Sequence, residues 1–201
     1  MYQSEWTNKP VLHLLPHWNW NEGQTVDVWA YSNAEEVELF LNGKSLGTKR
    51  KSADELHFMW RVPYQSGELK AISRTKGKEI LTKTIKTAGE VAKIQLTADR
   101  KNINADGKDL SFITVTLLDK HGNIVPKAHN LVKFELTGVG EIVGVDNGLQ
   151  TSLESFKASE RKAYNGQCLV VIQSKKTVGK MVLKARTEGV SEMATLDIMA
   201  K

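Results

Sequence analysis

Strict alternation of apolar and polar residues is the feature that most constrains the fold of this chain. Val26 and Val28 alternate with Asp27, for example. The same pattern returns at residues 37–41, 56–62 and 110–119. Successive side chains of a strand point to opposite faces, so each run places one apolar row on one face of a sheet. No long window shows helical periodicity, apart from one expected helical turn at residues 158–163, and the sequence therefore predicts an all-β fold.

Turn signals divide these runs into short strands. Asn42-Gly43 favours a type I′ hairpin between strands at 36–41 and 44–48, and Lys76-Gly77 favours a second turn. About seven strands are expected in the first half, at the spacing of a β-sandwich, and the second half shows the same pattern of short strands and turns. The small-residue stretch 87–90 separates the halves. We predict two tandem immunoglobulin-like β-sandwich domains, residues 1–88 and 89–201.

Composition excludes several function classes. The single cysteine, Cys168, excludes a disulfide scaffold and a multi-cysteine zinc site, and its apolar neighbours indicate a buried thiol. The net charge of +5 is spread evenly, with a surplus of 2 in residues 1–88 (12 Lys/Arg, 10 Asp/Glu) and 3 in residues 89–201 (16 and 13), so nucleic acid is not expected as a partner. No apolar run approaches the ~20 residues of a membrane span.

The residues that could carry chemistry do not form a catalytic pattern. No nucleophile elbow, phosphate-binding loop or zinc-protease motif is present. His13 and His17 flank Pro16, which argues against a helical metal pair, and we expect no metal and no cofactor. The pairs Glu35-Glu36 and Asp54-Glu55 are expected to be surface charge, since neighbouring strand residues face opposite ways. No catalytic residue is predicted.

Two short motifs remain as candidates. Asp146-Asn147-Gly148 could contact calcium or a sugar hydroxyl, but a plain hairpin turn is favoured. The segment His17-Trp18-Asn19-Trp20 is the more unusual, because two exposed tryptophans within three residues would demand a partner surface. Packing or interdomain contact is favoured there over a carbohydrate-stacking platform. Trp29 and Trp60 lie in alternating strands and are predicted to be core residues.

Longer stretches carry a family resemblance. Residues 2–7 and 10–20 resemble the segment that follows the catalytic barrel in bacterial glycoside hydrolase family 2 β-galactosidases, and residues 36–47 resemble the first immunoglobulin-like domain after that barrel. The next C-terminal domain of the family is similar at four further stretches, residues 105–110, 145–148, 156–158 and 163–170.

The resemblance implies that this chain is a non-catalytic C-terminal region that braces the catalytic barrel or shapes substrate access. Residues 1–20 would then lead in from the barrel, which carries the two catalytic glutamates and would be the partner, with a galactoside as a further partner. Met1 is expected to be a start added to a fragment. The parent is expected to act in the bacterial periplasm or outside the cell, and it could also be a glucuronidase or mannosidase. The alternatives are a carbohydrate-binding module using Trp18 and Trp20, or surface adhesin modules.

Overall fold

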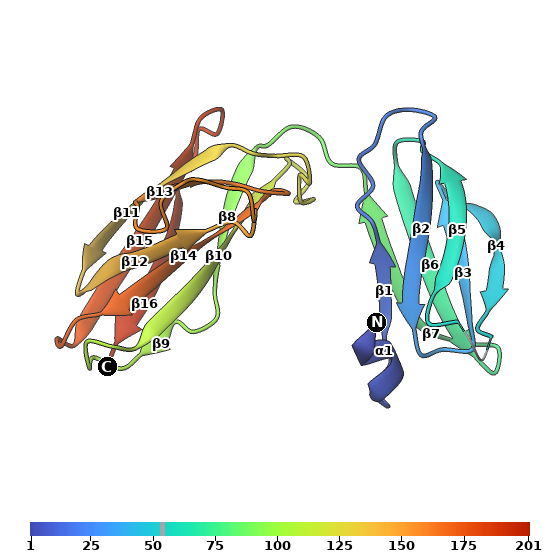
Figure 1. Cartoon of the computed structure of the whole chain (residues 1–201), viewed down its shortest axis with the longest axis horizontal. Helices are drawn as coiled ribbons and strands as arrows, with labels where there is room; N and C mark the ends of the chain where they lie inside the picture. The colour runs from blue at the N-terminus through green and yellow to red at the C-terminus, as the bar shows by residue number, and fades with distance from the viewer. Residues whose placement is uncertain (53–54) are drawn as a thin grey trace. The chain divides into compact units, whose positions relative to one another are not determined.

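A computed structural model describes residues 1–52 and 55–201 and divides the chain into two compact units, Met1–Thr87 and Ala88–Lys201 (Figure 1). Each unit is built from two layers of β-sheet, as predicted for tandem sandwiches of immunoglobulin-like type. The division falls between Thr87 and Ala88, one residue before the expected position. The all-β prediction is confirmed.

The first unit contains one short helix and seven strands among the residues that the structure describes. They are α1 (Tyr2–Trp6), β1 (Leu12–Leu15), β2 (Thr25–Ser32), β3 (Glu36–Leu41), β4 (Lys44–Arg50), β5 (Phe58–Pro63), β6 (Glu68–Thr75) and β7 (Lys78–Lys86). One sheet has the order β1-β2-β5 and the other β4-β3-β6-β7, all antiparallel.

The alternation seen in the sequence forms the core of this unit. On β2, Val26, Val28 and Ala30 are buried, while the residues between them are not. The remaining buried members of the same apolar cluster are Leu14, Trp18, Val37, Leu39, Leu41, Phe58, Trp60, Val62, Tyr64, Leu69 and Ala71. Burial of this apolar surface is the dominant stabilising contribution.

The second unit contains nine strands in the part of the chain that the structure covers. They are β8 (Lys93–Ala98), β9 (Asn102–Ile103), β10 (Leu110–Leu118), β11 (Leu131–Gly138), β12 (Gly140–Asp146), β13 (Glu160–Lys162), β14 (Gln167–Ser174), β15 (Gly179–Thr187) and β16 (Ala194–Ala200). The sheet orders are β12-β14-β10-β8 and β13-β11-β15-β16-β9, antiparallel except for the β16–β9 pair. The facing rows include Ile113, Val115 and Leu117 from β10 and Leu183 from β15.

The predicted hairpin turns are present. Asn42 and Gly43 have φ of 49° and 81°, and Lys76 and Gly77 have φ of 51° and 74°. Positive φ at both central positions is the requirement of a type I′ turn, and it joins β3 to β4 and β6 to β7.

Some local predictions are corrected. The residues from Ala158 to Ala163 form no helical turn, because Glu160–Lys162 instead pairs with β11 as β13. Leu56 lies before β5 and is exposed, so the alternating run begins at Phe58. The short helix α1 had no periodic signal, since five residues make little more than one turn.

Candidate functional site

Trp18 lies in the core of the first unit. Its side chain is fully buried, its indole N–H donates a 3.0 Å hydrogen bond to the carbonyl of Gln65, and its ring lies 5.2 Å from that of Tyr64. A buried ring has no free face, so within this structure Trp18 is not available for stacking on a sugar.

His17 and Trp20 form a second ring pair in the same segment. Their ring centroids are 4.6 Å apart with an interplanar angle of 18°, and the Trp20 indole N–H donates a 2.7 Å hydrogen bond to the His17 carbonyl. The main-chain N–H of Asn19 lies 3.3 Å from His17 Nδ1. His17, Asn19 and Trp20 are half-buried. The structure thus brings these three together at the surface and turns Trp18 inward.

The outer surface of the β1-β2-β5 sheet carries a larger aromatic cluster. Leu15 lies opposite Trp29 and Trp29 opposite Met59, so these side chains share one face, and His13 lies opposite Tyr31 in the neighbouring row. His57, just before β5, stacks on Trp29 with centroids 4.6 Å apart and lies 5.8 Å from the Tyr31 ring. We call the six residues His13, Leu15, Trp29, Tyr31, His57 and Met59 the aromatic face.

This position corrects the prediction for Trp29. Trp60 is in the core, but Trp29 alternates with buried Val28 and Ala30 and therefore points outward, where it is half-buried. The signal that could have identified the face was the second row of β2, because Trp29 and Tyr31 make both rows of this strand apolar. Sheets that are apolar on both faces are covered on both.

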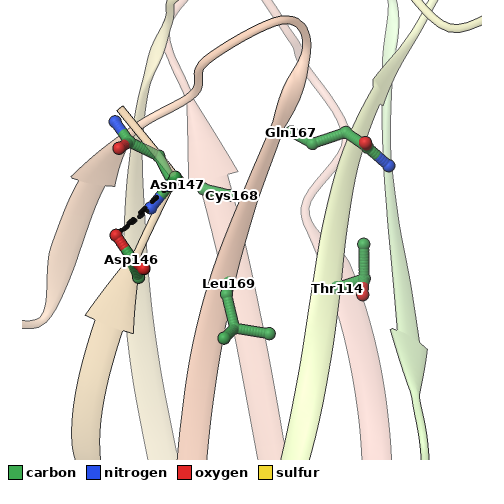
Figure 2. Close-up of a pocket in the computed structure, with 7 residues that line it drawn as sticks. Thr114, Asp146, Asn147, Gln167, Cys168 and Leu169 are labelled. Atoms are coloured by element: carbon green, nitrogen blue, oxygen red, sulfur yellow. Dashed lines mark hydrogen bonds between the residues drawn. The ribbon is translucent and has the colours of Figure 1, made fainter. Parts of the chain in front are cut away.

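The Asp146-Asn147-Gly148 motif forms a turn whose groups are used within the chain. Figure 2 shows Asp146 bonded to Asn147 at the end of β12, with Gln167 directed toward the strand of Thr114. Asp146 Oδ1 accepts from the N–H of Asn147 at 2.7 Å and of Gly148 at 3.2 Å, and Asn147 Nδ2 donates to the Lys162 carbonyl at 2.9 Å. These contacts match the favoured interpretation of a structural turn.

Arg161 is the residue that holds this turn, and it was not singled out in the sequence. Its side chain is fully buried. One guanidinium nitrogen donates to the Glu154 carbonyl at 3.0 Å, another donates to Asn147 Oδ1 at 3.1 Å, and the Asp146 carboxylate lies at 3.5 Å. The guanidinium also lies 5.3 Å from the Phe156 ring centroid. Arg161 therefore binds both the first residue and the middle of the loop between β12 and β13.

The hollow in Figure 2 is shallow, with a volume of about 240 Å³, and Cys168 contributes to its wall. Burial raises the pKa of the Cys168 thiol to about 12, against a smaller opposing effect of Arg161. The thiol is protonated at neutral pH and is therefore a poor nucleophile, as its apolar neighbours predicted.

The carboxylate pairs noted in the sequence have separate local partners. Glu35 Oε2 accepts from the main-chain N–H of Lys76 at 2.9 Å, whereas Glu36 pairs with Arg50 at 3.2 Å. Glu55 accepts from the Ser52 hydroxyl at 3.0 Å, and Asp54 lies outside the described residues. Within residues 1–52 and 55–201, no cluster of three or more His, Cys, Asp or Glu could hold a metal ion, and no helix is long and apolar enough to cross a membrane.

Two protein-family models match the chain. The model described as glycoside hydrolase family 2 C-terminal domain 5 matches residues 94–195, within the second unit. A domain model of unknown function, DUF4982, matches residues 23–81, within the first.

Curated relatives match over most of the chain. Beta-galactosidase BoGH2A of Bacteroides ovatus is 54% identical over 202 residues, which cover 100% of this chain and 24% of the relative. A putative beta-glucuronidase of Formosa agariphila is 35% identical over 152 residues, which cover 73% of this chain and 15% of the relative. The chain thus spans at most about a quarter of the length of these relatives.

Solved structures show the same fold. A glycosyl hydrolase family 2 member from Bacteroides cellulosilyticus has a TM-score of 0.92 and 38% identity, covering 99% of this chain and 29% of its own. A beta-glycosidase from Bacteroides vulgatus has a TM-score of 0.93 and 33% identity, covering 99% of this chain and 26% of its own.

Proposed function

The chain belongs to glycoside hydrolase family 2, as a C-terminal part of such proteins, and from this premise we propose that its two sandwiches are non-catalytic accessory domains. In this role they brace the catalytic barrel or shape the access of substrate to it. The observation that carries the proposal is the extent of the match. The chain aligns over its whole length with a relative of which it spans 24%, and the matching family model is one of a C-terminal domain.

The use of acidic side chains supports this role. A glycosidase needs two carboxyl groups that face one sugar. Here Asp119 accepts hydrogen bonds from Gly89, His121 and Asn123, and Asp109 pairs with Arg100 at 2.8 Å. These carboxylates are engaged in holding turns.

We propose that the half-buried part of the His17–Trp20 segment contributes an interdomain contact. His17, Asn19 and Trp20 retain exposed surface, and the rings of His17 and Trp20 are already stacked on each other before any other domain contacts them. Trp18 anchors the segment from below, which makes a carbohydrate platform of both tryptophans the weaker alternative.

For the parent enzyme we propose hydrolysis of β-galactosides in the bacterial periplasm or outside the cell. The relative at 54% identity is named a beta-galactosidase, whereas the one at 35% is named a putative beta-glucuronidase. Parallel assays of the whole parent with nitrophenyl galactoside and nitrophenyl glucuronide separate the two substrates. Assay of periplasmic and cytoplasmic fractions places the enzyme.

The experiment that tests the accessory role uses this chain alone and in a chimera. The chimera is the B. ovatus enzyme in which this chain replaces the 202 matching residues. We expect the chain alone to release no nitrophenol from nitrophenyl galactoside, the chimera to be active, and the same enzyme truncated before those residues to lose activity or thermal stability. Turnover by the chain alone would overturn the proposal, as would a truncated enzyme that matches the intact one in rate and melting temperature.

A further inference from the structure

We propose that the aromatic face of the β1-β2-β5 sheet is the surface on which the catalytic domain of the parent enzyme docks. The inference rests on the proposed accessory role and goes beyond it by naming the docking surface and its chemistry. Trp29 is at the centre of this surface, flanked by Leu15 on β1 and Met59 on β5.

The register makes the aromatic face continuous. Leu15, Trp29 and Met59 form one row across all three strands, and His13 and Tyr31 form the next row. The His57 ring bridges the rows through its contacts with Trp29 and Tyr31. The centre of the face is therefore a fixed apolar surface.

The opposite sheet of the same unit shows what a solvated face looks like in this chain. On β3 and β6 the outward side chains include Glu38 and Arg74, which form a 2.8 Å ion pair, and Lys70, whose ammonium lies 5.0 Å from the Phe40 ring centroid. On this surface the Phe40 ring lies beside a charged side chain. The six members of the aromatic face instead form a patch without Lys, Arg, Asp or Glu. Charged side chains border it: the Asp27–Arg61 pair lies in the next row, and Lys49, Arg50 and Glu55 line a hollow with His57 and Met59. An apolar patch with a polar border is the pattern of an interaction surface.

The chemistry of the face fits a protein rather than a glycan. Four of its six members are Trp, Tyr, Met and Leu, residues of the kind that form a protein interface core, and the other two are histidines. The bidentate Asp27–Arg61 pair, at 2.8 and 3.2 Å, borders the face as a polar rim. A glycan site would need several polar groups aimed at sugar hydroxyls beside the rings. Trp29 instead uses part of its ring against His57 and is flanked by aliphatic and thioether groups.

The occupant we assign is the rest of the same polypeptide. The B. ovatus relative is about four times as long as this chain, and the chain's first segment is held beside the sheet. Asn33, which follows β2, donates to the carbonyls of Thr7 and Lys9 and accepts from the N–H of Val11, and Lys51 pairs with Glu5 of α1. This segment also carries the exposed ring of Trp6, which lies 5.0 Å from the Tyr2 ring. Sequence upstream of α1 would thus enter at the end of the sandwich where β2 ends, two residues beyond Tyr31 of the aromatic face.

Methionine oxidation offers a direct test, because the chain contains a matched pair. Met59 on the aromatic face is 38% exposed and Met199 on β16 is 37% exposed, while Met181 is fully buried. Peroxide should oxidise Met59 and Met199 at similar rates in the isolated chain. In the active chimera described above, the oxidation rate of Met59 should fall by a factor of roughly ten or more, because the oxidant reaches Met59 only when the docked domains separate. The oxidation rate of Met199 should not change.

Equal rates at Met59 in the chain and the active chimera would overturn the docking surface. That result would leave the accessory role standing if the chimera still needed this chain for activity, so the two failures are distinguishable. Protection of Met59 in the isolated chain by galacto-oligosaccharide would assign the face to a glycan, and protection that rises with chain concentration would assign it to a second copy. Either result would also overturn the proposal.

A second measurement covers a chimera that does not fold. Hydrogen exchange of the natural B. ovatus enzyme is compared with that of its own isolated 202-residue region. We expect slower exchange in the intact enzyme at the positions that align with β2 and β5, and unchanged exchange at those that align with β3. No difference at β2 and β5 would contradict the inference.

Where the chimera does fold, a pair of variants gives a third measurement. Met59→Lys should lower the melting temperature of the chimera, whereas Met199→Lys should not.

Discussion

The indole N–H of Trp18 donates a 3.0 Å hydrogen bond to the main-chain carbonyl of Gln65, 47 residues later in the chain. The bond ties the irregular segment between β1 and β2 to the loop between β5 and β6. The ring is also fully buried. The Trp18 side chain therefore packs in the apolar core while its one polar group is hydrogen-bonded.

Replacement of Trp18 by alanine should therefore be among the most destabilising single changes in the first unit. Truncation of a buried tryptophan costs about 3–5 kcal/mol of unfolding free energy. Trp20→Ala is the matched control. Trp20 packs against the same apolar cluster but is only half-buried, so its loss should cost clearly less. Urea unfolding of the whole chain, followed by circular dichroism, measures both, and equal losses would contradict the assignment of Trp18 to the core.

Asp119 should be the most important carboxylate of the second unit. It is 1% exposed, and it accepts hydrogen bonds from the N–H groups of Gly89, His121 and Asn123 and from the Asn123 side chain. Loss of an acceptor leaves buried donors without a partner, which costs about 2–4 kcal/mol for a charged group with several bonds.

The comparison for this prediction is Asp197→Ala. Asp197 pairs with Lys180 at 2.8 Å, but both side chains are more than half exposed, and such pairs contribute about 0–1 kcal/mol. Asp119→Ala should lower the unfolding free energy well beyond Asp197→Ala in the same denaturant series. A similar small loss for both would show that the Asp119 hydrogen bonds add no net stability.

Acid should destabilise the second unit through carboxylates whose pKa is low in the folded state. The Arg100 guanidinium and the N–H groups of Asn104 and Leu110 hold the pKa of Asp109 at about 2, against an ordinary value of 3.8. Burial alone would raise the pKa of Asp119, but its hydrogen bonds outweigh burial and lower it.

Because these folded pKa values lie below the unfolded ones, the stabilisation is complete above about pH 4 and declines as pH falls toward about 2. Unfolding free energies measured between pH 7 and pH 2 should show this decline. Asp109→Asn should make the profile flatter over that range. If the unfolding free energy declined equally in the unaltered chain and in Asp109→Asn, Asp109 would not contribute to the acid destabilisation.

The regular part of the fold could be predicted from the sequence because it depends on local signals. The Asn42-Gly43 turn needs only two residues that tolerate positive φ, and the buried row of β2 follows from a period of two. Strand ends moved by one or two residues, since pairing partners rather than propensity decide where a ladder stops. Lys44–Arg50, for example, extends two residues past the expected end.

The candidate site was less predictable because its residues lie where the periodicity of the sequence gives no signal or an ambiguous one. Trp18 falls in a segment without regular structure. Packing or interdomain contact was favoured for its two tryptophans, but no periodic pattern indicated that Trp18 would be the buried one. Trp29 lies in a clear strand, but a strand that is apolar in both rows does not reveal which row faces the core. Arg161 is an arginine in a polar stretch, and only the fold shows that it is fully buried.

Arg161 supplies the last prediction. Its guanidinium is bonded to Asn147 at the start and to Glu154 in the middle of the loop between β12 and β13. It also lies 5.3 Å from the ring centroid of Phe156, which is 61% exposed. Replacement by alanine should remove these bonds and about 2–3 kcal/mol of stability, since Asp146 and Glu154 are partly exposed and can be rehydrated. Hydrogen exchange should accelerate in residues 147–159 before it changes in β10 or β15. Arg161→Lys keeps the charge but not the fork of donors, so it should also release the loop. If Arg161→Lys exchanged like the unaltered chain, charge alone would hold the loop and the bonded geometry would not be the cause.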